Sequence, residues 1–110
     1  MVDLSQTVSA ISLEEAKAWL RVDYSEEDQL ISMLILSASQ MVETRLRRAI
    51  VTRGQETGIA ATIDKVPGSI KSVILSLVAY QYENRSATDD ELRARCMRAA
   101  GLDGFIDWSA

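Results

Sequence analysis

Two stretches of the sequence carry apolar residues around most of the surface that a helix would give them, and this feature limits the possible folds most. Apolar side chains follow two neighbouring sides of a helix over residues 30–46, and they extend beyond one stripe over residues 70–82. An ordinary surface helix has one apolar stripe, whereas a helix that is apolar on most sides is buried on most sides. A chain of 110 residues hides only about two-thirds of its unfolded surface, so some of this apolar surface is left over.

The surplus has two interpretations. In the first, the two apolar helices form a central hairpin, the shorter helices wrap around it, and the surplus is ordinary partial exposure. In the second, which we favour, part of the surface is an interface between subunits, because large exposed apolar patches mark interaction sites. The outer apolar positions that would form this interface are Met33, Leu36 and Leu75.

Capping signals place the first two helices. Ser12 and Glu15 form a capping box, in which the serine caps the helix and the glutamate reaches back. The predicted first helix covers residues 13–21. Ser25 is the next expected N-cap, and the acids after it suit the first turn of a second helix over residues 26–49. The apolar face of the first helix consists of Leu13, Ala16, Trp19 and Leu20.

A segment without helical periodicity follows the second helix. Residues 51–65 contain glycines, threonines and β-branched residues, which are typical of a loop or a short β-hairpin. Pro67 as the first helical residue, or Ser69 as the N-cap, then opens a third helix over residues 70–84.

The last helix and the tail complete the chain. Thr88 and Glu91 form a second capping box before a fourth helix over residues 89–100, and Gly101 is the expected stop. The tail, residues 102–110, carries large apolar groups that either pack back on the domain or dock into a partner as anchors. These groups are Leu102, Phe105, Ile106 and Trp108.

Together these signals predict an all-α fold. It is a small bundle of about four helices, with the loop or β-hairpin inserted near residues 51–65. We expect residues 1–110 to form a single domain, because two domains of this length would be too small to hold a core. No apolar run reaches the roughly 20 residues that span a bilayer, and the first residues lack the basic region of a signal peptide. We therefore expect no signal peptide and no membrane segment.

The composition excludes most catalytic and metal chemistry. The chain has no histidine and one cysteine, Cys96, which removes Ser-His-Asp and Cys-His catalysis, disulfide frameworks and His or Cys metal clusters. Its adjacent acids lie in predicted first turns, where they cap helices rather than catalyse. The glycines fit neither a phosphate-binding nor a dinucleotide-binding loop. We expect no enzyme activity, no cofactor and no metal.

Charge is distributed unevenly along the chain. Residues 1–30 hold seven acids and two bases, whereas residues 31–60 hold two acids and four arginines. This pattern suits charge pairing between copies of the chain, but it also fits the ordinary preference of acids for helix starts and bases for helix ends. The charged candidates for a subunit interface are Glu26, Glu27, Arg45, Arg47 and Arg48.

Two sets of residues resemble one protein family. The first set is Leu13, Ala16, Lys17, Leu20, Arg21, Val22 and Asp23, followed by the acids at 26–28 and the long apolar helix. The second set is the Pro-led helix start at residues 66–71 and the run Tyr82, Glu83, Asn84 and Arg85. In order and spacing these residues resemble the tailed-phage head–tail connector family, also described as DNA-packaging adaptors. The resemblance covers about residues 11–50 and 66–87.

The resemblance implies a helical, non-enzymatic subunit of the virion neck that is assembled in the host cytoplasm. Copies would form a ring below the portal, which prolongs the DNA channel and offers a platform for the stopper or tail-completion protein. The C-terminal part of family members reaches the portal, which implies a docking role for residues 102–110. Arg53 and Lys65 would face the channel, in transient non-specific contact with packaged DNA.

Other functions remain open. A small helical nucleic-acid-binding protein or packaging regulator would place the same arginines on phosphates, although a net charge of -4 is unusual for a nucleic-acid coat. A scaffold for another protein would use the apolar helix faces instead.

Overall fold

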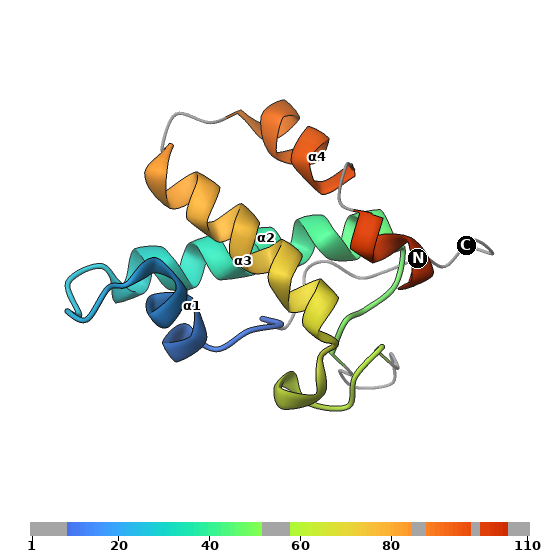
Figure 1. Ribbon diagram of the computed structural model, residues 1–110, viewed down its shortest axis with the longest axis horizontal. Coiled ribbons are helices and arrows are strands. Elements are labelled where there is room, and N and C mark those ends of the chain that lie inside the picture. Colours follow the sequence, from blue (N-terminus) through green and yellow to red (C-terminus); the bar gives the residue numbers. More distant parts are fainter. Residues whose placement is uncertain (1–8, 52–57, 85–87, 98–99, 106–110) are drawn as a thin grey trace.

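Two long helices cross at the centre of the molecule, and shorter helices pack around them (Figure 1). The computed structural model describes residues 9–51, 58–84, 88–97 and 100–105. In chain order the elements are α1 (Leu13–Leu20), α2 (Asp28–Leu46), the 3₁₀ helix η2 (Ile63–Lys65), α3 (Gly68–Glu83), α4 (Asp89–Met97) and the 3₁₀ helix η3 (Ala100–Phe105). Within these ranges there are four α-helices and no strand, which confirms the all-α prediction.

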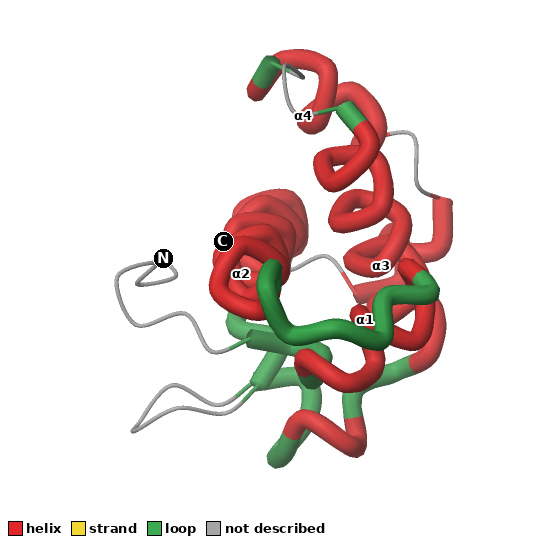
Figure 2. Tube along the Cα trace, turned by 90° about the vertical axis from the view of Figure 1, so that its left-hand side faces the viewer, coloured by secondary structure: helices red, strands yellow, loops and turns green. Residues whose placement is uncertain are grey.

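The core lies where α2 crosses α3, the most extensive contact between two elements. The buried apolar residues of α2 are Ile31, Ile35, Ala38, Val42 and Leu46, and those of α3 are Ile70, Ile74, Leu77 and Val78. This spacing of three or four residues matches the helical period, and burial of one such large side chain contributes about 1.5–3 kcal/mol. Figure 2 shows α2 nearly end-on, with α1 and α3 on the same side of it.

Two polar residues of α2 are also fully buried, Ser39 and Glu43. The backbone N–H of Ala10 donates to Oγ of Ser39 at 3.2 Å, and the N–H of Ile50 donates to Oε2 of Glu43 at 2.9 Å. Buried polar groups are retained where they are hydrogen-bonded. Through these two side chains α2 holds both the segment before α1 and the segment after its own end.

The helix α1 begins where the sequence predicts. The N–H of Ser12 donates to Oε1 of Glu15 at 2.9 Å, and the N–H of Glu15 donates to Oγ of Ser12 at 3.1 Å, which confirms the capping box. The hydrogen bonds with Ser12, together with the Lys71 ammonium 2.9 Å from Oε2, hold the pKa of the Glu15 carboxyl below its ordinary value of 4.5. Arg21 then adopts the left-handed conformation, with a φ of 59°, and ends the helix.

The helix α2 is shorter at both ends than the sequence predicts. Glu27 occupies the N-cap position, so the predicted cap by Ser25 is wrong. The reason is a turn before the helix, in which the N–H of Asp28 donates to the carbonyl oxygen of Ser25 at 3.2 Å. At the other end the helix stops at Leu46, because Arg47 takes a left-handed φ of 61°.

The segment after α2 returns to the core without regular strands in its described part. The N–H of Ala60 donates to the carbonyl oxygen of Ile50 at 2.8 Å, and Val51 and Ala60 form an isolated parallel bridge. A β-hairpin pairs its strands antiparallel, so the described ends of the segment do not confirm that alternative. Its expected turn falls in residues 52–57, outside the described ranges. The 3₁₀ helix η2 follows, which the sequence reading did not anticipate.

The helix α3 begins between the two predicted alternatives. Pro67 precedes the first helical residue, Gly68, and Ser69 lies inside the first turn, so neither Pro67 as the first helical residue nor Ser69 as the cap is correct. The carbonyl oxygen of Pro67 accepts hydrogen bonds from the N–H groups of Ile70 and Lys71, both at 3.1 Å. Pro67 therefore starts the helix with its backbone.

The last elements fold back onto the core. The N–H of Glu91 donates to Oγ1 of Thr88 at 3.2 Å, which supplies one of the two bonds of the predicted capping box. The helix α4 ends at Met97 rather than at residue 100, and Gly101 lies inside η3 instead of acting as the stop. Leu102 is fully buried, and η3 contacts both α3 and α2.

None of the helices in the described ranges combines the length and the apolar character that crossing a membrane requires.

Candidate assembly surface

The outer face of α2 leaves large apolar side chains in solvent. Met33 is 66% exposed and Leu36 is 38% exposed. The sequence from residue 29 to residue 42 contains no charged side chain, so their exposed neighbours on this face are serines and a glutamine. An exposed helix face normally carries charged residues opposite the core, whereas an uncharged face suits close contact with another surface.

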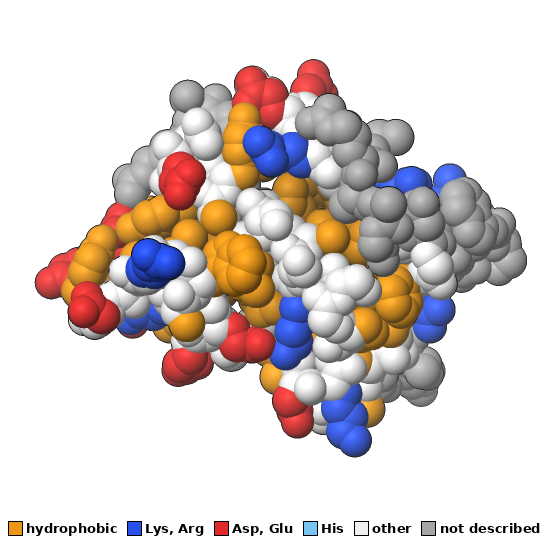
Figure 3. All heavy atoms as spheres, in the orientation of Figure 1, with side chains coloured by type: hydrophobic (Ala, Val, Ile, Leu, Met, Phe, Trp, Pro, Cys, Tyr) orange, Lys and Arg blue, Asp and Glu red, His pale blue; other side chains and the backbone are white. Residues whose placement is uncertain are grey.

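The third predicted apolar position differs from these two. Leu75 is half-buried and packs against the core. The crossing of α2 and α3, with shorter helices around it, therefore absorbs part of the apolar surplus inside the chain, as the first interpretation expects. Met33 and Leu36 are apolar side chains that this packing leaves exposed. In Figure 3, hydrophobic side chains also gather between α1 and the middle of α3.

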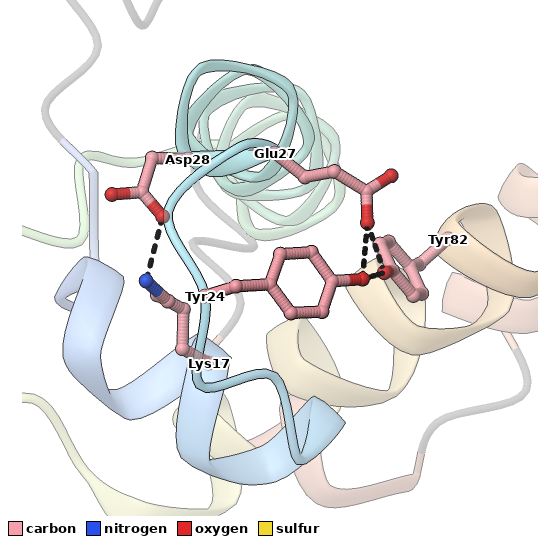
Figure 4. A network of polar contacts seen from close by, with 5 residues as sticks. All are labelled: Lys17, Tyr24, Glu27, Asp28 and Tyr82. Atoms are coloured by element: carbon pink, nitrogen blue, oxygen red, sulfur yellow. Dashed lines mark hydrogen bonds and ion pairs between the residues drawn. The ribbon is translucent and has the colours of Figure 1, made fainter.

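A hydrogen-bonded cluster holds the acidic loop between α1 and α2 (Figure 4). The Tyr82 hydroxyl, on α3, donates to Oε1 of Glu27 at 2.5 Å, and the Tyr24 hydroxyl donates to the same oxygen at 2.8 Å. The bond to Glu27 raises the pKa of Tyr82 above its ordinary value of 10.0, because ionisation would remove the donated proton and place two negative charges together. The cluster thus ties the loop to the end of α3.

An ion pair holds the other side of the same loop. Nζ of Lys17, on α1, lies 2.7 Å from Oδ1 of Asp28 at the start of α2. The two acids predicted for an interface therefore differ in position. Glu27 turns toward Tyr24 and Tyr82, whereas Glu26 is exposed. Asp23, in the same loop, is exposed as well.

The arginines at the end of α2 also differ from one another. Arg47 is exposed, whereas Arg45 and Arg48 are half-buried. Arg45 lies near α4: burial raises the pKa of the Cys96 thiol, and the positive charge of Arg45 opposes that rise.

The predicted portal and channel residues are only partly described. Leu102 is fully buried in the chain's own core, so its side chain offers no docking surface, and the alternative in which the tail packs back is correct for this residue. Phe105 is half-buried and packs against the core. Lys65 is exposed at the end of η2. The residues Arg53, Ile106 and Trp108 lie outside the described ranges.

Two aromatic residues are exposed that the sequence pattern did not mark as surface candidates. Trp19 is 53% exposed, although the periodicity of α1 places it on the apolar face, and Tyr24 in the following loop is 45% exposed. The helix α1 has only eight residues, and Ala16 is its buried one. Periodicity predicts the direction of a side chain, but it does not predict how far the neighbouring element extends. The exposure of Trp19 therefore could not be predicted from the sequence pattern.

In the described part of the chain, no three His, Cys, Asp or Glu side chains gather in a group that could hold a metal ion. The residues that the structure does bring to the surface are apolar, uncharged polar and oppositely charged groups in separate areas. Such areas recognise other macromolecules through shape and charge.

Comparison with known proteins found a matching family. A family model described as "Phage gp6-like head-tail connector protein" matches residues 10–98, which include all four α-helices. A search of the curated proteins and a search of the solved structures each found no match. The family is a structural one of the phage virion, in which the connector lies at the head–tail junction and assembles with other virion components. Because the match covers most of its length, the chain belongs to the phage gp6-like head-tail connector proteins.

Proposed function

We propose that this chain is one subunit of a ring that sits below the portal, extends the DNA channel and offers a platform for the stopper or tail-completion protein. The match to the connector family over residues 10–98 is the observation that carries the proposal. Assembly takes place in the host cytoplasm in this proposal.

The exposed apolar side chains of α2 support the ring. Met33 and Leu36 stand in solvent on a face without charge, and a second subunit would cover them. Leu75, on α3, adds less exposed apolar surface, because it is already half-buried by the chain itself. In this proposal neighbouring copies pack through the outer faces of α2 and α3.

Charge sets the register between neighbours in the same proposal. The exposed Glu26 and the half-buried Glu27 lie before α2, and Arg45, Arg47 and Arg48 lie at its end. Opposite charges across an interface fix orientation more than they add affinity. Glu27, Arg45 and Arg47 also interact within their own chain, so their pairing with a neighbour competes with those contacts.

The tail and the loop face the remaining partners. Phe105, Ile106 and Trp108 dock on the portal, while the buried Leu102 anchors the tail to the subunit. Arg53 and the exposed Lys65 face the channel. Their contact with DNA is weak and independent of sequence, because phosphate contacts position a duplex without reading it and packaged DNA must slide past.

The test measures molar mass by light scattering after size exclusion, over a range of concentrations, with and without the portal protein. We expect a discrete large species whose negative-stain images show a central hole, either for the chain alone or for its complex with the portal. A chain that forms no large species and does not bind the portal would contradict the proposal. Steeply salt-dependent duplex binding by a monomer would instead support a nucleic-acid-binding regulator.

A further inference from the structure

The two ends of the molecule carry opposite charge. The described residues extend 41 Å along the longest axis, and α2, which has 19 residues, spans about 28 Å of it. The loop with the exposed Asp23 and Glu26 lies at one end, and Arg47 and Arg48 lie beyond the far end of α2 (Figure 1). Figure 3 shows several acidic side chains with a basic one toward the left-hand end, and basic side chains toward the right-hand side.

The acidic end also carries exposed aromatic rings. Trp19 and Tyr24 flank the turn that ends α1, and both are exposed. Because they are five positions apart in the sequence, their Cα atoms lie within about 17 Å of each other. The hydroxyl of Tyr24 is held by Glu27, so its exposed ring is fixed in direction before any partner arrives. Neither aromatic side chain takes part in the proposed contact between subunits through α2 and α3.

Exposed aromatic rings next to carboxylates suit one kind of group in particular. A guanidinium is planar, stacks on aromatic faces and pairs with carboxylates at the same time. The chain itself contains such a stack, because Cζ of Arg95 lies 3.8 Å from the centre of the Tyr80 ring.

We propose that Trp19 and Tyr24 form a platform on which Arg47 and Arg48 of a second copy stack, while Asp23 and Glu26 pair with the same arginines. The occupant is a second copy because the complementary charge lies on the opposite end of the same chain. The inference rests on the proposed ring function and adds a contact between the unlike ends of successive subunits to the contact through α2 and α3. Two different, complementary patches on one chain give head-to-tail contacts, which close into a ring when the rotation between copies allows it.

Charge-swapped variants test the pairing. The first variant carries D23K and E26K, the second carries R47E and R48E, and R93E on the exposed part of α4 is the matched control. We expect each of the first two to associate about tenfold or more weakly than the wild type, as measured by light scattering and sedimentation at low salt. The control should associate as the wild type does.

Mixing then separates a direct pairing from a general loss. Every junction in an alternating mixture of the two variants joins opposite charges again, and half of the junctions keep the arginines that stack on the aromatic rings, so the mixture should associate more tightly than either variant alone. A chain that carries all four substitutions should recover less, because glutamates do not stack on the rings. If the mixture associates no more tightly than the variants alone, the two ends do not pair.

Aromatic variants test the platform separately from the charges. We expect W19A to weaken association about 30-fold, as for a central aromatic anchor, and W19F to retain most of it. Y24A removes the ring, whereas Y24F removes only the hydroxyl that contacts Glu27, so Y24A should weaken association more than Y24F. Thermal unfolding of each monomer shows that the fold is retained.

Three further outcomes overturn the inference. In the first, W19A and Y24A associate as tightly as the wild type. In the second, the wild type stays monomeric at every concentration. In the third, another virion protein protects the fluorescence of Trp19 from a soluble quencher, whereas association of the chain with itself does not. The proposed function survives the first and the third if the chain still forms a large species or binds the portal. The inference and the function therefore fail by different measurements.

Discussion

Individual polar residues decide how the irregular segments of this chain attach to its helices. Glu43 is fully buried in α2 and accepts the backbone N–H of Ile50, while Ser39 accepts that of Ala10. A buried N–H that loses its acceptor costs the full desolvation of that group. These two polar side chains therefore contribute to the stability of the fold, although they lie in a mainly apolar helix.

Replacing Glu43 tests this view. We expect Glu43→Ala to lower the free energy of unfolding by about 2–3 kcal/mol, because it leaves the N–H of Ile50 without its acceptor and opens a cavity. Glu43→Gln keeps both the size and an acceptor oxygen, so its loss should be smaller. Urea unfolding followed by circular dichroism measures both, and equal losses for the two variants would contradict the role of the hydrogen bond.

The capping box gives the stability a dependence on pH. The pKa of Glu15 is lowered in the folded chain, by Ser12 and then by Lys71, so its contribution is present above the unfolded value of 4.5 and is lost as the pH falls through the lower folded value. We expect the urea midpoint of the wild type to fall between about pH 5 and about pH 3. Glu15→Gln should show a smaller fall over the same range, and an identical fall would contradict this assignment.

At the scale of the elements, helix ends depend on backbone conformations that the local sequence does not favour. Both α1 and α2 end at an arginine with positive φ, Arg21 at 59° and Arg47 at 61°. A residue with a Cβ atom is disfavoured in this region, where glycine is the usual choice. Each arginine holds this conformation because the residues that follow, such as the buried Val22, must turn toward the core.

Replacing Arg21 tests whether its positive φ strains the end of α1. We expect Arg21→Gly to raise the free energy of unfolding by about 0.5–1 kcal/mol, since glycine adopts the left-handed conformation without the Cβ clash and only part of the gain is lost to chain entropy. Arg21→Ala keeps the Cβ atom and should not stabilise. Thermal unfolding of the two variants measures the difference, and an equal effect of both would show that the side chain, not the backbone, matters at this position.

At the scale of the whole molecule, apolar surface and charge are distributed as an assembling subunit requires. The four large apolar residues that are exposed in the described part of the chain fall between residues 19 and 36, in the half that also holds the acidic loop. The far end of α2 is basic. This polarity along one axis gives the chain two unlike ends, which a head-to-tail assembly uses and a monomer does not need.

The outer face of α2 can be tested without disturbing the fold. We expect the pair Met33→Gln and Leu36→Gln to weaken association of the chain by about tenfold, or about 1.4 kcal/mol, because buried apolar contact between copies is lost. The free energy of unfolding of the monomer should change less than the free energy of association, since Met33 is 66% exposed and Leu36 is 38% exposed. Sedimentation measures association and urea unfolding measures stability. A drop in stability with unchanged association would show that these residues serve the chain itself.

The sequence by itself determined the all-α class, the number of helices, the capping box of α1 and the connector family. Each of these depends on residues close to one another in the chain, such as Ser12 and Glu15, or on an order of motifs that needs no coordinates. Absence of histidine likewise limits the chemistry whatever the fold is.

Only the tertiary structure decided which of these residues remain available at the surface. Glu27 turns inward because Tyr82, 55 residues away in sequence, donates to it, and Leu102 is buried because η3 reaches α2 and α3. Trp19 stays exposed because the short helix α1 buries little beyond Ala16. Periodicity states which way a side chain points along its own helix, but its burial depends on elements far away in sequence, and those are placed only when the whole chain has packed.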